Sequence, residues 1–183
     1  VERALSRIQM AAKFAWLMPT GRYADGRLDN VALEIGQELD RILPRANPRG
    51  RTLHGPTLPT DSRRKVLHVA TTVNDVGGHT RLIANWIRND RESCHSVVIT
   101  ATWINQGRSV TPDWLEGAVA ESGGMLVRLP SDGVVTRARW LREIVQANVD
   151  MVMVHHHPSD VVPILAFAVG CCPPVAIVDQ AAH

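Results

Sequence analysis

The sequence has no marked excess of charge of either sign. Its 183 residues include 20 basic and 18 acidic ones, for a formal net charge of +2. Proteins dedicated to nucleic acid usually carry a strong basic surplus, so this balance argues against a nucleic-acid partner. Charged residues are limited to 21% and hydrophobic residues reach 45%, which excludes wholesale disorder and indicates a folded domain with a substantial core.

Cysteine is scarce as well, and the three that occur are Cys94, Cys171 and Cys172. An odd number with two adjacent members is poorly suited to a disulfide framework. This usage fits a reducing compartment, so we expect the protein in the cytoplasm. No two cysteines have the C-x-x-C spacing that is typical of zinc sites.

We expect no signal peptide in Val1–Met18, and the sequence has no long unbroken apolar run. Lys13 interrupts the apolar stretch between Val1 and Met18, and no small-residue cleavage site follows it. The longest uncharged run, Val161–Val178, approaches the length of a membrane span, but prolines and a glycine break it. We expect a short helix followed by a buried strand there.

Residues 1–60 are expected to form a helical extension and a linker. Apolar residues recur at spacings of three and four in two stretches, which predicts two helices, the second capped by Asp25 or Asp29. Pro44–Ser62 then holds four prolines, which is typical of an irregular linker. The helices either pack on the following domain or belong to another module. Their apolar positions are Leu5, Ile8, Ala12, Ala15 and Trp16, then Leu28, Val31, Ile35, Leu39 and Ile42.

Residues 61–183 alternate short apolar runs with helical patterns. The runs are rich in Val, Ile and Leu with little alternation, as in strands buried on both faces of a parallel sheet. We therefore expect an α/β fold, a Rossmann-like, doubly wound parallel sheet of about five strands. The expected strands are Val66–Val73, Ser96–Trp103, Met125–Leu129, Met151–His155 and Val175–Val178. The expected helices are Thr80–Asn89, Pro112–Glu121, Thr136–Ala147 and Asp160–Val169.

Two of these helices carry specific expectations about their ends and faces. In the first, Leu82 and Trp86 are expected to lie on one face, which Ile83 either shares or not. In the second, Thr111 is expected to cap the helix with Pro112 at its first position.

Ligands of such sheets bind beyond the carboxyl ends of the strands. The loop after the first strand contains Gly77, Gly78, His79, Thr80 and Arg81. The glycines let the backbone approach a ligand, and the following helix directs its N–H groups at an anion such as a phosphate; the alternative is a tight turn that merely needs glycine. The loop is neither a G-x-G-x-x-G fingerprint nor a P-loop, so dinucleotide binding and ATPase chemistry lose support.

A second group of polar residues follows the fourth strand. Side chains alternate along a strand, so His155 and His157 are expected to face one way and His156 the other. Consecutive histidines cannot easily bind one metal, so substrate contacts or acid–base catalysis are favoured. The alternative is that one or two of these imidazoles form hydrogen bonds within the edge of the sheet. Asp160 either caps the next helix or contacts substrate. After the fifth strand, His183 either lines the same crevice or is simply the end of the chain.

These motifs together resemble a known family. Val66–Asp90 (VLHVATTVNDVGGHTRLIANWIRND) resembles the opening of the N-terminal domain of GT-B glycosyltransferases, and more closely a bacterial group with a GGHTR-type loop and an N-W-I-type helix. Met151–Ala166 (MVMVHHHPSDVVPILA) and Pro173–His183 (PPVAIVDQAAH) resemble later segments of that domain. The resemblance covers Lys65–His183 and implies two Rossmann-like domains that face each other across a cleft.

The resemblance implies a function and roles for the residues. The N-terminal domain mainly binds the acceptor, and the C-terminal domain, which is absent from the sequence, binds the nucleotide-sugar donor with a pair of glutamates. By resemblance, Gly77 and Gly78 lie near the donor phosphates or the acceptor, and His183 stands where many members have a catalytic histidine. The sequence departs from the pattern at Gln180 and Ala182, where relatives often have a histidine and an acid.

The expected reaction transfers a sugar from a nucleotide-sugar co-substrate to an acceptor hydroxyl, without a metal or other cofactor. The chain alone is expected to be inactive without the donor domain. Arg81 either stabilises the leaving diphosphate or is a solvated helix residue, and His79 is one candidate base. The residues expected to contact substrate are Gly77, Gly78, His79, Thr80, Arg81, His155, His157 and Asp160, and those expected in catalysis are His156 and His183.

Two other functions stay open. The first is a non-catalytic Rossmann-like module that binds a nucleotide or a small acid. The second is peripheral contact with the inner face of the membrane through two basic patches, for which solvated charged surfaces are the alternative. The patches are formed by Arg63, Arg64 and Lys65 and by Arg137, Arg139 and Arg142.

Overall fold

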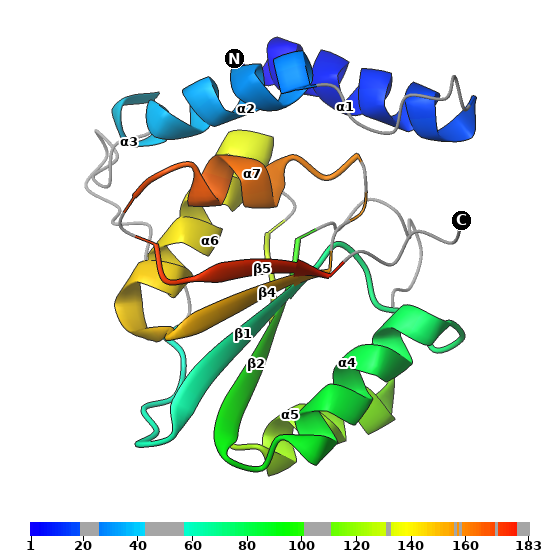
Figure 1. The fold of residues 1–183 in the computed structure, drawn as a ribbon, viewed down its shortest axis with the longest axis vertical. Coiled ribbons are helices and arrows are strands. Elements are labelled where there is room, and N and C mark those ends of the chain that lie inside the picture. Colours follow the sequence, from blue (N-terminus) through cyan, green and yellow to red (C-terminus); the bar gives the residue numbers. More distant parts are fainter. Residues whose placement is uncertain are drawn as a thin grey trace.

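The protein is an α/β domain built on five parallel strands (Figure 1). The computed structural model describes residues 1–18, 26–42, 57–100, 111–130, 133–155, 157, 159–170 and 172–178. The strands are β1 (Arg64–Ala70), β2 (Ser93–Ile99), β3 (Leu126–Arg128), β4 (Met151–His155) and β5 (Val175–Val178). They lie in the order β3-β2-β1-β4-β5. The Rossmann-like fold expected from the sequence is confirmed, and the bounds of β4 and β5 are as expected.

Helices cover both faces of the sheet (Figure 1). Those of the α/β domain are α4 (Gly78–Asn89), α5 (Asp113–Glu121), α6 (Val134–Asn148) and α7 (Val162–Phe167). The first part of the chain adds α1 (Glu2–Leu17), α2 (Gly26–Gln37) and α3 (Leu39–Ile42). In Figure 1, α4 and α5 lie below the sheet, α6 and α7 lie above it, and α1 to α3 form a further layer on α7. The described residues therefore form a sheet between helical layers of unequal thickness.

Two hydrophobic clusters hold these layers together. One lies between the sheet and α6 and α7, and Leu5 and Leu39 of the first helices belong to it. The other lies between the sheet and α4 and α5, and includes Ile83 and Ile87. The apolar runs form strands because β1, β2 and β4 face a helical layer on each side.

The first two strands begin and end earlier than expected. β1 starts at Arg64 and β2 at Ser93, and these two residues are the first pair of the parallel ladder. Hydrogen-bond register and not hydrophobicity sets these ends, so polar residues enter both strands. The expectation that all strands are buried on both faces is wrong for β5, where Ile177 is 70% exposed. β5 pairs with β4 alone and lies at the edge of the sheet.

Two helices differ in detail from the expectations. On α4, Leu82 and Trp86 lie on one face as expected, but this face is partly exposed and Ile83 lies instead on the buried face with Ala84 and Ile87. α5 begins one residue later than expected, at Asp113, and no side chain caps it. The hydroxyl of Thr111 instead accepts a hydrogen bond from Arg128.

The caps expected for the second N-terminal helix also differ from the structure. Asp29 lies within the first turn of α2 and is no cap. Asp25 lies outside the described residues.

The N-terminal helices pack on the α/β domain. The carbonyl oxygen of Gly36 in α2 accepts a hydrogen bond of 2.6 Å from Nη2 of Arg142 in α6. A Cβ on Gly36 would lie 2.6 Å from the Cβ of Ala168, so the glycine permits the close approach of α2 to the end of α7. The Glu2 carboxylate accepts a hydrogen bond of 3.1 Å from the backbone N–H of Val135, at the start of α6.

The three arginines of α6 do not form a surface patch. Arg137, Arg139 and Arg142 are all nearly fully buried, so neither alternative given above for them holds. Arg137 donates to the carbonyl of Thr100 at 2.8 Å, and Arg139 pairs with Glu143 at 3.1 Å.

The basic residues at the start of β1 are engaged with neighbours. Arg63 pairs with Asp61 and Arg64 with Asp90, while Lys65 donates to the side chain of Asn148. Among the described residues, no helix combines the length and apolar character that crossing a membrane requires.

Candidate functional site at the switch point of the sheet

The strand order reverses its direction between β1 and β4. From β1 the chain continues to β2 and β3 on one side, and from β4 to β5 on the other. Ligands of open α/β sheets bind at this point, beyond the carboxyl ends of the strands. β1 ends at Ala70, whose register partner is His155 at the end of β4. The two loops expected to bind substrate therefore start from neighbouring positions at this edge.

The loop after β1 leads into α4 through two glycines. Gly77 has φ +144° and ψ 149°, a backbone conformation that residues other than glycine rarely adopt. Gly78 is the first residue of α4, and a Cβ added at either glycine meets no atom within 4 Å. The turn does need glycine at Gly77, as the alternative supposed, and open space lies in front of the backbone at both glycines.

Hydrogen bonds from its own residues hold this loop. The hydroxyl of Thr80, which is buried, accepts a hydrogen bond of 3.0 Å from the backbone N–H of Asn74. Nε2 of His79 lies 2.7 Å from the carbonyl oxygen of Thr72. A carbonyl oxygen can only accept, so Nε2 of His79 carries the hydrogen. Thr80 thus shapes the loop from inside, while His79 is half-buried.

Arg81 lies in the first turn of α4 and is exposed. Its guanidinium carbon lies 5.6 Å from the centre of the Trp114 ring, within reach of a cation–π interaction. The indole N–H of Trp114 donates to Asp75 at 3.0 Å, which ties α5 to the glycine loop. Arg81 is therefore a positive charge at the exposed start of α4, supported by the ring of the neighbouring helix.

Asp160 is buried at the start of α7. Its Oδ1 accepts a hydrogen bond of 3.0 Å from the backbone N–H of Val162, and its Oδ2 accepts one of 2.9 Å from the hydroxyl of Thr71. Oδ2 also accepts a hydrogen bond from the hydroxyl of Thr100. The carboxylate satisfies the start of the helix, as the capping alternative supposed. It also ties α7 to the residues that follow β1 and β2.

The histidines expected after β4 and β5 do not share one kind of position: one ends a strand, one lies in a loop, and two lie outside the described residues. β4 ends at His155, so strand alternation does not extend to His157. Nδ1 of His157 lies 3.0 Å from the Ser159 hydroxyl, within its own loop. His156 and His183, the residues expected in catalysis, lie outside the described residues.

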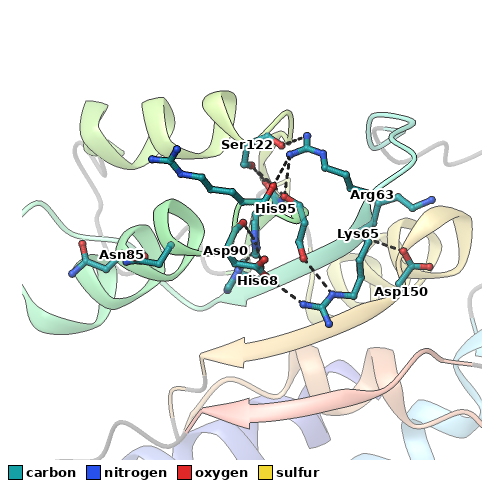
Figure 2. A network of polar contacts seen from close by, with 12 residues as sticks. Arg63, Lys65, His68, Asn85, Asp90, His95, Ser122 and Asp150 are labelled. Carbon is teal, nitrogen blue, oxygen red and sulfur yellow. Dashed lines mark hydrogen bonds and ion pairs between the residues drawn. The ribbon is translucent and has the colours of Figure 1, made fainter.

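His155 forms a hydrogen bond within the sheet, as the alternative for these imidazoles supposed, and it belongs to a row of three buried imidazoles that the sequence did not predict. Nε2 of His155 lies 3.0 Å from Nδ1 of His68, and Nε2 of His68 lies 3.1 Å from Nδ1 of His95. The rings of His68 and either neighbour have centroids 5.3 Å apart. Figure 2 shows His68 and His95 beside Asp90, whose carbonyl oxygen lies 3.2 Å from Nε2 of His95. We call these three residues the histidine row.

Burial holds the histidine row in its neutral form at neutral pH. Loss of hydration lowers the pKa of His68 well below its usual value, and the rings of His155 and His95 lower it further. Burial, with a smaller effect of His79, lowers the pKa of His155 to about 4. Burial also lowers the pKa of His95, although Asp90 opposes the shift.

The surface of the described residues also has a shallow groove of about 390 Å³, which runs along α4 and reaches Asp90. Its lining residues are Leu82, Asn85, Trp86, Asn89 and Asp90. The described part of the chain holds no group of three or more His, Cys, Asp or Glu side chains placed to bind a metal ion.

Comparison of the sequence with known protein families found no family model that matches it. A search among curated proteins likewise found no match. The geometry of the site and the resemblance of the motifs are therefore the two grounds for a proposed function.

Proposed function

We propose that this chain is the acceptor-side half of a glycosyltransferase, which moves a sugar from a nucleotide-sugar donor to an acceptor hydroxyl. The observation that carries the proposal is the open backbone of Gly77 and Gly78 at the switch point of the sheet. This is the loop that resembles the GT-B pattern, and it lies at the edge where ligands of such sheets bind. In this proposal, a donor-binding half is the partner with which this chain forms the complete enzyme.

The start of α4 supplies the electrostatics that such a reaction needs. The leaving nucleoside diphosphate gains negative charge as its bond to the sugar breaks. α4 is 12 residues long, and its N–H groups and positive dipole end stand directly behind Gly77. Arg81, in the same turn, adds a full positive charge.

A base must accept the proton of the acceptor hydroxyl if the reaction inverts the sugar carbon. His79 has the required form, because its Nε2 donates to Thr72 and a neutral ring then leaves Nδ1 as an acceptor. His183 keeps its proposed catalytic role on the strength of the resemblance, and His156 is a further candidate for the base. Gly77, Gly78 and Arg81 are the proposed phosphate contacts.

Binding is tested by a nuclear magnetic resonance titration of the chain with UDP, GDP and their sugar conjugates. We expect the amide signals of Gly77, Gly78 and Arg81 to shift with one of these ligands. Gly78→Leu places a bulky side chain in the open space and should abolish the shifts. Gly117→Leu is the matched control, since a Cβ at Gly117 within α5 also meets no atom within 4 Å. Shifts confined to another surface, or none with any nucleotide, would refute the proposal.

Catalysis is tested by incubating a nucleotide sugar with a pool of acceptors and measuring the freed nucleotide. The gene product that carries this chain together with a donor-binding half should turn over, and the chain alone should not. Transfer by the chain alone would contradict the division into two halves.

A non-catalytic binding module is the second candidate, and the side chains of the site favour it. The polar groups of Asp160, Thr80 and His157 are engaged within the protein, in helix capping and loop contacts. Such a module would show the same amide shifts with a nucleotide, but no turnover in any form of the protein. The two assays together separate the candidates.

A further inference from the structure

The first helix, α1, has two opposite faces. Its inward face carries Leu5 and Ile8, which are buried in the hydrophobic cluster on the α6 and α7 side of the sheet. On the opposite face, residues at spacings of four and three form a second stripe, which is exposed along its whole length. We call this second set the outward stripe; it consists of Arg3, Arg7, Met10, Phe14 and Leu17.

The outward stripe changes character along the helix. Arg3 and Arg7 lie in the first two turns, and both are exposed. The next three members are large and apolar, and Met10, Phe14 and Leu17 are 67%, 61% and 57% exposed. Scattered apolar residues are normal on a protein surface, whereas a contiguous row of them marks a contact site. α1 therefore presents two cations at its start and an apolar contact surface at its end.

Acidic residues are kept away from the apolar half of the stripe. The one acid of α1 is Glu2, whose carboxylate accepts the hydrogen bond from Val135 at the start of α6. The acids of α2 are Asp29 and Glu34. Figure 1 shows α1 and α2 running in opposite directions from the point where they contact, so the last turns of α1 lie away from both.

We propose that the outward stripe docks the protein on the surface of an anionic lipid bilayer. Arg3 and Arg7 donate hydrogen bonds to the phosphate and carboxylate groups of the lipid heads. Met10, Phe14 and Leu17 enter the boundary between the heads and the acyl chains, which removes their apolar surface from water. This surface differs from the two basic patches that the sequence offered for membrane contact, which are buried or engaged with neighbours.

The packing of α1 fixes how deep the contact is. The helix has 16 residues and so is about 24 Å long, which is shorter than the apolar core of a bilayer. Leu5 and Ile8 hold its other face on the protein, so only the outward side chains reach the lipid. The contact is therefore peripheral and reversible, and the proposal stands independently of the proposed glycosyltransferase function.

The order of the stripe favours a bilayer over a second copy of this chain. Two parallel copies of α1 would bring Arg3 and Arg7 against the same two arginines, and like charges repel. Two antiparallel copies would place the arginines against Phe14 and Leu17, which buries cations without an acid to pair with them. A bilayer meets both halves of the stripe, since its heads are charged and its acyl chains are apolar.

Binding is tested by co-sedimentation of the chain with lipid vesicles. Vesicles of phosphatidylcholine with about 30% phosphatidylserine should bind about 10-fold more tightly than phosphatidylcholine alone. In 1 M salt the screening length falls to about 3 Å, so this preference should disappear. Equal binding to the two kinds of vesicle at low salt would overturn the proposal, and so would no binding to either.

Variants of the stripe locate the contact. Phe14→Ser removes an apolar side chain from the lipid and should weaken binding to the anionic vesicles by about 10-fold. Arg7→Gln should weaken it by about 5-fold and leave binding to phosphatidylcholine unchanged. Both side chains are exposed, so circular dichroism should show the helix content of the wild type.

Two matched controls lie outside the stripe. Leu33→Ser replaces an apolar residue of α2 that is 38% exposed, and Arg91→Gln replaces an exposed arginine that follows α4. Both should bind the anionic vesicles as the wild type does. Losses in the controls equal to those of Phe14→Ser and Arg7→Gln would overturn the assignment to α1, since binding would then depend on overall composition.

A nuclear magnetic resonance measurement shows the contact directly. Anionic bicelles that contain a nitroxide on the lipid acyl chain should broaden the amide signals of Met10, Phe14 and Leu17 more than that of Leu33. Broadening confined to other residues would overturn the proposal. Light scattering tests the second copy: a wild-type dimer that Phe14→Ser makes monomeric, without vesicle binding, would assign the stripe to self-association instead.

Discussion

Arg142 on α6 donates a hydrogen bond of 2.6 Å to the carbonyl oxygen of Gly36 in the last turn of α2. The same guanidinium donates to the carbonyls of Leu165 and Ala166, which lie in the last turn of α7. The final carbonyls of a helix lack partners within the helix and carry its negative dipole end. One buried cation therefore completes the ends of two helices that are far apart in the sequence.

Replacing Arg142 by leucine should destabilise the protein strongly. Arg142→Leu leaves three carbonyl groups without their donor, and we expect a loss of about 2 to 4 kcal/mol of unfolding free energy. Arg88→Leu is the control, since Arg88 is exposed and donates to the carbonyl of Trp114. It should cost less than about 1 kcal/mol. Urea denaturation measures both variants, and equal losses would contradict the role given to Arg142.

Gly36 tests the contact between α2 and α7 from the other side. Gly36→Ala places a Cβ 2.7 Å from the carbonyl oxygen of Leu165 and 2.6 Å from the Cβ of Ala168, so the helices must move apart. We expect a loss of about 1 to 3 kcal/mol. Gly26→Ala, at the start of the same helix, meets no atom within 4 Å and should be neutral. A thermal melt that shows the same Tm for both variants would speak against the packing of α2 on α7.

The two glycines of the loop should respond differently to alanine. Gly77→Ala forces a side chain onto φ +144°, and we expect it to cost about 1 to 3 kcal/mol. Gly78→Ala lies in open space within α4 and should leave stability unchanged or slightly raised. Denaturant unfolding of the pair provides the measurement. Equal stability of the two variants would be inconsistent with the backbone conformation of Gly77.

The histidine row predicts a loss of stability in acid. The unfolded chain takes up protons near the usual histidine pKa of about 6.5, whereas the folded His155 resists protonation until its pKa of about 4. The unfolded state thus binds more protons between these values, so unfolding free energy falls as the pH falls through this window. His155 alone contributes about 3 kcal/mol that is present above the window and lost below it.

Urea unfolding at a series of pH values measures this dependence. His155→Gln removes one titrating ring, so the slope of unfolding free energy against pH should become shallower while a positive slope remains from His68 and His95. A wild-type slope of zero across the window would show that the row is not buried in its neutral form.

Much of the fold was predictable because burial and strand formation leave the same pattern in a sequence. β4 and β5 match their apolar runs, and Gly77 lies between β1 and α4 as expected, although α4 begins at Gly78 and not at the expected Thr80. The exposure of β5 was not predictable, since its sequence resembles that of the inner strands and only the strand order places it at an edge.

The arginines of α6 and the histidine row were missed for a different reason. An arginine in a helix normally indicates a solvated surface, and only the three-dimensional contacts show that Arg142 completes the ends of α2 and α7. His68 and His95 stand within apolar runs, which was the available signal that each needs a buried partner. The partners are set by strand register, and nothing local in the sequence reveals register between distant strands.

The bond between Glu2 and Val135 constrains the order in which the protein assembles on the ribosome. The partners lie 133 residues apart, so at about 5 to 20 residues per second the first helix waits about 7 to 27 s for the start of α6 to be made. During that time the apolar face that contains Leu5 and Ile8 lacks the surface it later covers. The helix that carries this face is thus synthesised well before the surface on which it packs, and its burial has to wait for that surface.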